Sequence, residues 1–262
     1  MSSITIIQQR DAVHFVTDAA HYDLEGVVVA VESKICELHR SGCVFSTRGS
    51  NWSTQFLEWM LSRCESFDEI LRVLPGVMSA IDTAFLTFAS DIPPRMRHYI
   101  ITVAGWSEKA QRVTTAMACT YSKGDAADTE GWSAHDFYGQ YTPVYVPAVI
   151  TIPPVALDDA LGRAVDDTDD WVQAMDPASD GLAIFEQQRR FISTYADSVR
   201  YIVGGFAELT TVTRTGITRT VLKEYPDRVG ELIAPEGAVP IADAWARELA
   251  WRKANAEQAA AA

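Results

Sequence analysis

The sequence predicts an α+β fold: a four-layer αββα sandwich in which two antiparallel sheets pack face to face between layers of helices. Short segments rich in β-branched residues occur in blocks that alternate with amphipathic segments, in the order strands, two helices, strands, two helices, strands, helix. Each sheet has two faces to cover, so facing sheets with helices outside satisfy this order. A doubly wound fold would instead alternate single strands with single helices, and no GxGxxG or GxxxxGK[ST] segment supports a phosphate-binding loop.

The first block contains short runs typical of strands. They are Ile4–Ile7, Val13–Thr17, Val27–Val31, Ile35–Leu38 and Cys43–Thr47. Alternation along these runs predicts that one set of apolar side chains faces the space between or beneath the sheets. The members of that set are Val13, Phe15, Val27, Val29 and Val31.

Two helices are predicted next. Ser50 or Asn51 caps the first, whose apolar residues fall at helical spacing. These residues are Phe56, Trp59, Met60 and Cys64. The second spans Phe67–Phe88 and is expected to be interrupted at Pro75 and Gly76.

The second block predicts strands at Tyr99–Ala104, Val113–Tyr121 and Val144–Ile152, with a Gly- and Asp-rich loop at Lys123–Gly139. A helical pair follows. Its members are Ala156–Val165 and Gly181–Tyr195, the latter capped by Ser179 or Asp180.

The closing elements are strands at Tyr201–Thr213 and Ile217–Leu222, joined by a hairpin at Arg214-Thr215-Gly216, and a charged helix at Ile241–Glu257. We expect Gly204-Gly205 to let the strand bend or another backbone approach closely. Residues 1–240 are predicted to form one sandwich domain, and residues 241–262 a C-terminal helix with a frayed alanine tail.

Composition and charge restrict the partners of the chain. Its 262 residues include 22 Lys and Arg against 35 Asp and Glu, and a net charge of −13 repels phosphate backbones and anionic lipid surfaces. We therefore expect neither nucleic acid nor a membrane as a partner. The longest strongly apolar runs are about half of what spans a bilayer, and the start of the chain lacks the basic flank and apolar stretch of a signal peptide. We expect a cytoplasmic protein.

No motif indicates a metal or a cofactor, and none is expected. The four cysteines form no CxxC pair, so reduced thiols are predicted. His21 and Asp23 have a spacing suited to a turn, and the acidic cluster at 166–170 lacks the glycine and terminal glutamate of a calcium loop.

The spacing of three residues near the start of the chain has a parallel in a known family. Ser2 begins the chain after Met1, Asp18 stands in HFVTDAA, and Lys34 stands in VESKI, and each follows the one before it by sixteen positions. This pattern resembles the proteasome β-subunit branch of the N-terminal-nucleophile (Ntn) hydrolases. The resemblance implies a catalytic serine at Ser2, exposed by removal of Met1, with Asp18 and Lys34 supporting it. Gly49 in STRGS follows Lys34 by fifteen residues and matches, one residue late, the glycine whose amide stabilises the oxyanion in the family.

The implied chemistry explains why these residue types belong together. A free α-amino group titrates near about 7.7 to 8.0, so at neutral pH it can accept the proton of a hydroxyl on its own residue. A neighbouring lysine favours the neutral amine and stabilises the oxyanion, and an aspartate keeps that lysine charged.

Two functions remain open at this point. The first is an Ntn amide hydrolase that cleaves a peptide or another amide, and the second is a catalytically inactive proteasome-like subunit of a ring or larger particle. The sequence has no Ser-Gly-Ser helix start with the supporting Ser and Asp of active proteasome subunits, and the chemical state of Ser2 separates the two functions. In both cases we expect a homo-oligomer or a subunit of a larger assembly.

Overall fold

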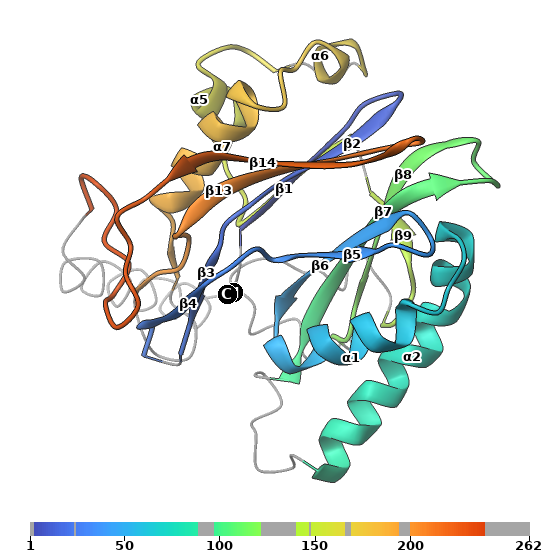
Figure 1. Ribbon diagram of the computed structural model, residues 1–262. Coiled ribbons are helices and arrows are strands. Elements are labelled where there is room, and N and C mark those ends of the chain that lie inside the picture. Colours follow the sequence, from blue (N-terminus) through green and yellow to red (C-terminus); the bar gives the residue numbers. More distant parts are fainter. Residues whose placement is uncertain are drawn as a thin grey trace, which may run out of the picture.

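Two antiparallel sheets form the centre of the protein (Figure 1). The computed structural model describes residues 3–23, 25–88, 97–121, 140–146, 148–165, 169–193 and 200–238. The first sheet has the order β10-β1-β2-β13-β14 and comprises β1 Ile4–Gln8, β2 Ala12–Thr17, β10 Val149–Ile152, β13 Phe206–Thr213 and β14 Gly216–Glu224. The second has the order β5-β6-β7-β8-β9 and comprises β5 Ile35–Leu38, β6 Cys43–Gly49, β7 Tyr99–Ser107, β8 Arg112–Cys119 and β9 Val144–Tyr145.

Two short ladders and the helices complete the described elements. The ladders pair β3 Ala20–Tyr22 with β4 Val28–Val31, and β11 Ile192–Ser193 with β12 Arg200–Tyr201. The helices are α1 Asn51–Leu61, α2 Phe67–Phe88, α5 Leu157–Leu161, α6 Asp169–Gln173 and α7 Ser179–Arg189. In Figure 1, α1 and α2 lie against the second sheet and α7 lies against the first.

The hydrophobic core follows from this arrangement. One cluster contains residues from both sheets, such as Phe15 of β2 and Met117 of β8. A second joins Phe45 of β6 to the buried sides of α1 and α2. On the other sheet, Val16 of β2 packs with Phe185 of α7. The chain therefore has the α+β content and the antiparallel sheets that its sequence predicts.

The predicted strand faces are correct in β2 and wrong at Val29 of β4. Val13 and Phe15 are fully buried, but Val29 is 53% exposed while Val28 is buried. β4 pairs with β3 in a separate two-stranded ladder whose register shifts between His21 and Tyr22. Val31 of the predicted set still packs against the small cluster that contains Val28, so the prediction fails at Val29.

The core side of α1 includes only part of the set of apolar residues named from its helical spacing. Phe56 and Trp59 are 52% and 58% exposed, whereas Met60 and Cys64 of the same set pack in the core with Leu57 and Leu61. Ser50 is the N-cap residue, one of the two expected. Large apolar residues occur on both sides of this helix, with the aromatic ones on the exposed side, so helical spacing alone did not identify the side that packs on the sheet.

The predicted interruption of the second helix at Pro75 and Gly76 is wrong. α2 continues through Pro75 for 22 residues, because Leu74, Met78 and Ile81 carry one buried stripe across the proline. This packing outweighs the cost of about 3 kcal/mol that an interior proline imposes. By length and composition alone α2 could cross a membrane. Its buried stripe against the second sheet is that of a helix covering a core.

Three predicted segments prove to be divided. Val144–Ile152 forms β9 in one sheet and β10 in the other, because the chain crosses between the sheets here. Helix α7 begins after Ala178 and ends at Arg189, before the short strand β11. Tyr201–Thr213 is broken at Gly204-Gly205, where Gly205 has φ of +82°. The predictions for 123–139 and 241–262 lie outside the described residues.

Candidate functional site

Asp18 and Lys34 form a buried ion pair. Lys34 Nζ lies 2.8 Å from Asp18 Oδ2, and the two side chains are 6% and 0% exposed. The other carboxylate oxygen, Oδ1, accepts a hydrogen bond of 2.8 Å from the backbone N–H of Ser3. One aspartate therefore holds both the lysine and the first described residue of the chain.

The sheets explain why these residues meet. Asp18 directly follows β2, and Ile4 of β1 is paired with Thr17 of β2, so Ser3 and Asp18 lie at the same end of the first sheet. Lys34 directly precedes β5, at one end of the second sheet. The ion pair thus joins an end of one sheet to an end of the other.

Burial dominates the electrostatics of the pair. Desolvation lowers the pKa of Lys34, and the charge and hydrogen bond of Asp18 oppose that change. Burial also lowers the pKa of His21, with Lys34 as a further cause, while Asp18 and Glu32 act in the opposite direction. The contact with Asp18 thus offsets part of the cost of burying the Lys34 ammonium.

The start of the chain is anchored beside this pair. Ser3 Oγ donates to Oε1 of Gln188, a fully buried side chain of α7 that also accepts a hydrogen bond from Thr5 Oγ1 at 3.2 Å. The amide nitrogen of Gln188 donates to Pro153 O at 3.0 Å. Ser2 itself lies outside the described residues, so its position and its α-amino group are not part of this geometry.

Gly49 lies at the end of β6, just before α1. In the ladder between β5 and β6, Ile35 pairs with Ser46, so Lys34 and Gly49 are at the same end of these two strands. Gly49 has φ of +117°, and a Cβ there would lie 2.3 Å from the carbonyl oxygen of His98. The position is therefore restricted to glycine by backbone conformation and by space.

Sequence reasoning assigned no role in the site to Gly204. Its N–H donates a long hydrogen bond of 3.4 Å to Asp18 Oδ2, and its carbonyl accepts from the N–H groups of Ala19 and Ala20, each at 3.0 Å. The Gly204-Gly205 pair was the available signal. The predicted close approach of another backbone is confirmed, and that backbone is the segment that carries Asp18.

Other nucleophiles and ligands are less suited to chemistry. All four cysteines are free, and burial raises the pKa of each thiol, so thiolates are disfavoured. Within the described part of the chain, no group of three or more His, Cys, Asp or Glu side chains could hold a metal ion.

Comparison with known proteins agrees with the fold. No protein-family model matches the chain, and no curated protein matches it. Among solved structures, the chain is similar to the Anbu (Gly-1) mutant from Hyphomicrobium sp. strain MC1, with a TM-score of 0.54 and 13% identity, over 98% of this chain and 100% of that one. The chain has a proteasome-like fold. An identity of 13% shows the fold alone. The ion pair of Asp18 and Lys34 is observed in this chain and is not inferred from that similarity.

Proposed function

We propose that this proteasome-like chain is an Ntn amide hydrolase in which Ser2, exposed by removal of Met1, is the nucleophile. The fold proposed with it is the four-layer αββα sandwich of Ntn hydrolases. One observation carries the proposal: Asp18 holds the buried Lys34 ammonium with one carboxylate oxygen and the N–H of Ser3 with the other. A buried cation is thereby held close to the backbone that follows Ser2.

The proposed reaction needs no histidine. The α-amine of Ser2 accepts the proton of its own hydroxyl as the oxygen attacks the carbonyl carbon of an amide. Lys34 stabilises the negative charge that develops and favours the neutral amine through repulsion of like charges. The protonated amine then gives its proton to the departing nitrogen, the C–N bond breaks, and water hydrolyses the resulting ester to release the acid and regenerate Ser2.

Gly49 is the proposed source of an oxyanion-stabilising amide. It lies at the same strand end as Lys34, and α1 begins two residues later with no acidic residue in its first turn. The partial positive charge of a helix N-terminus favours an anion nearby. These two features support a site for the oxyanion at this end of the second sheet.

The remaining parts of the proposal concern substrate, assembly and location. The substrate class is a peptide or another amide, and the chain acts as a homo-oligomer or as a subunit of a larger assembly in the cytoplasm. Fold similarity to Anbu is compatible with assembly. The exposed aromatic side of α1 offers a surface for it, with Trp52, Phe56 and Trp59 more than half exposed.

The test combines two measurements on the purified full chain. Intact mass must show that Met1 is absent, and a β-lactone that acylates serine hydroxyls must form an adduct that maps to Ser2 rather than to Ser3. A chain with a fusion tag ahead of Met1 keeps the amine blocked and is the matched control, which we expect to remain unlabelled. Retention of Met1, or an adduct absent from Ser2, rejects the enzyme.

The second candidate is a catalytically inactive proteasome-like subunit. The exposed aromatic side of α1 favours it, because that surface fits an assembly whether or not Ser2 reacts. On this alternative the ion pair of Asp18 and Lys34 only joins the two sheets. An unlabelled chain that forms a stable oligomer in light scattering selects this function.

A further inference from the structure

A second buried ion pair is separated from the candidate site by the backbone of residues 203–205. Arg189, at the end of α7, and Asp227, which follows β14, have side chains that are 4% and 3% exposed. Arg189 Nη1 lies 2.7 Å from Asp227 Oδ2, and Nη2 donates to Oδ1 at 3.3 Å. The guanidinium also lies over the ring of Tyr225, 3.9 Å from its centroid. A bidentate ion pair that packs on an aromatic ring has a well-defined geometry.

This pair holds the backbone of residues 203–205. Arg189 Nη1 donates to the carbonyl oxygen of Val203 at 3.1 Å, and Asp227 Oδ2 accepts the N–H of Gly205 at 2.8 Å. The N–H of Tyr225 donates to the carbonyl of Gly205 at 2.9 Å. Three backbone groups of residues 203–205, here called the turn, are therefore hydrogen-bonded to Arg189, Asp227 and Tyr225.

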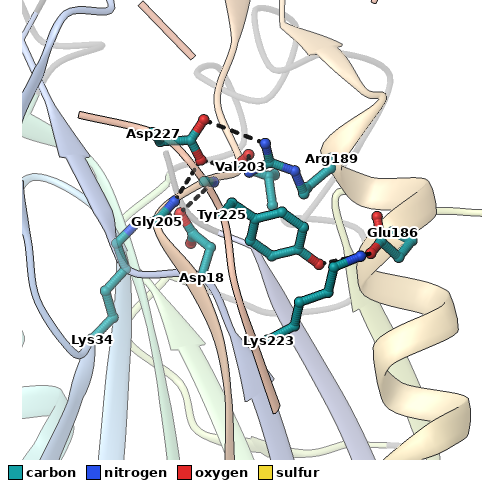
Figure 2. A network of polar contacts seen from close by, with 10 residues as sticks. Asp18, Lys34, Glu186, Arg189, Val203, Gly205, Lys223, Tyr225 and Asp227 are labelled. Atoms are coloured by element: carbon teal, nitrogen blue, oxygen red, sulfur yellow. Dashed lines mark hydrogen bonds and ion pairs between the residues drawn. The ribbon is translucent and has the colours of Figure 1, made fainter. Parts of the chain in front are cut away.

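The opposite side of the same turn holds Asp18. Gly204 donates to Asp18 Oδ2, the oxygen that also receives the Lys34 ammonium, and Gly204 O accepts from the two residues after Asp18. In Figure 2, Gly205 lies between the carboxylates of Asp18 and Asp227. Both glycines are tightly enclosed, since a Cβ at Gly204 would lie 2.7 Å from Asp227 Oδ2. A displacement of the turn must therefore reach the carboxylate that holds Lys34.

We propose that Arg189 and Asp227 are positioning residues for the site at Asp18 and Lys34. By fixing residues 203–205 they fix the carboxylate that holds the Lys34 ammonium, an inference that rests on the function proposed above. Within the described residues, the hydrogen bonds of the two side chains join them to each other and to the backbone of residues 203–205. A purely structural role would be limited to attaching α7 to the segment after β14, and it would leave the environment of Lys34 unchanged.

The test measures Lys34 directly and needs no substrate. The chain has five lysines, so spectra of isotope-labelled lysine side chains can be assigned by single substitutions and titrated by NMR. In Asp227→Asn we expect the contact between Asp18 and Lys34 to loosen. An opposite charge in contact raises the pKa of a lysine by about one to three units. We therefore expect the pKa of Lys34 to fall by about one unit in this variant. Lys223→Met is the matched control, because it removes an ion pair with Glu186 of the same helix and is expected to leave the pKa of Lys34 unchanged.

A second variant covers the case in which Asp227→Asn does not fold. Arg189→Met with Asp227→Leu leaves no unpaired charge, and replacing a buried ion pair by apolar residues often preserves the fold. In a folded variant of either kind, an unchanged or raised pKa of Lys34 overturns the inference. Labelling of Ser2 is read separately: an unlabelled wild-type chain rejects the hydrolase, and a fallen Lys34 pKa in the same experiments still supports the positioning role.

Discussion

Asp18 and Lys34 are joined at 2.8 Å across the ends of two different sheets, and neither charged group is appreciably exposed to water. A buried ion pair of this kind recovers its desolvation cost only when further hydrogen bonds complete it. The N–H of Ser3 completes Asp18, and Gly204 adds a weaker donor. Removing either charge alone therefore harms the protein more than removing both.

This relationship predicts the stability of three variants. Lys34→Met leaves the Asp18 carboxylate buried without its cation, and we expect the free energy of unfolding to fall by about 3 to 5 kcal/mol. Lys34→Met with Asp18→Asn removes both charges and is expected to recover most of that loss. Urea unfolding of the two variants measures these changes. Arg72→Met is the control, because it breaks an exposed ion pair and is expected to lower the free energy of unfolding by less than about 1 kcal/mol. A Lys34→Met protein as stable as the wild type contradicts it.

Sequence reasoning was most successful where local pattern and pairing agree. The bounds of β5 were predicted correctly, and β1 and β2 were predicted to within one residue at each end, because these short segments are bounded by polar residues or turns. The spacing of Asp18 and Lys34 also identified two residues that come together. Their contact depends on two strand ends, and those ends are fixed by segments that can be recognised locally.

Other features depend on contacts that no local pattern encodes. Arg189 and Asp227 are 38 residues apart, and the sequence around each is ordinary for a helix end and a loop. The exposure of Val29 depends on which strand β4 pairs with, and the continuity of α2 past Pro75 depends on the sheet beneath it. Tertiary packing decided the last two of these against a local expectation.

His14 predicts a loss of stability in mild acid. Burial lowers its pKa from 6.5 to about 4, and its ring nitrogens contact Thr211 Oγ1 at 2.9 Å and Gln9 Oε1 at 3.1 Å. Below pH 6.5 the unfolded chain binds a proton that the folded chain excludes, so the stabilising contribution present above pH 6.5 is lost as the pH falls toward 4. The loss is about 3 kcal/mol when the shift is fully expressed.

His14→Gln removes this titration. We expect its free energy of unfolding to depend less on pH between 6.5 and 4 than that of the wild type, as measured by urea unfolding at several pH values. His39, whose side chain is 86% exposed, provides the matched control His39→Gln, which is expected to keep the wild-type pH dependence. Equal slopes for His14→Gln and the wild type would show that His14 does not carry the effect.

The two sides of α1 predict a sharp contrast between neighbouring residues. Leu57 is fully buried and Phe56 is 52% exposed. We expect Leu57→Ala to lower the free energy of unfolding by about 2 to 5 kcal/mol through loss of buried surface and the cavity left behind. Phe56→Ala is expected to stay within about 0.5 kcal/mol of the wild type. A Phe56→Ala loss as large as that of Leu57→Ala, in urea unfolding of the dilute protein, would mean that this side of α1 is covered.

Substitution of Gly49 is predicted to cost more stability than substitution of Gly42. Both Gly49 and Gly42 have positive φ, at +117° and +63°, but a Cβ at Gly42 meets nothing within 4 Å, whereas one at Gly49 lies 2.3 Å from His98 O and 2.9 Å from Tyr99 Cα. Gly42→Ala is expected to lose about 1 to 2 kcal/mol from its left-handed backbone alone. Gly49→Ala must also displace the backbone of β7, so we expect a loss of about 2 to 4 kcal/mol in urea unfolding.

Because that displacement moves the strand end proposed to supply the oxyanion amide, acylation of Ser2 by the β-lactone should slow in folded Gly49→Ala and keep the wild-type rate in Gly42→Ala. Equal acylation rates in the two folded variants would separate Gly49 from the proposed site.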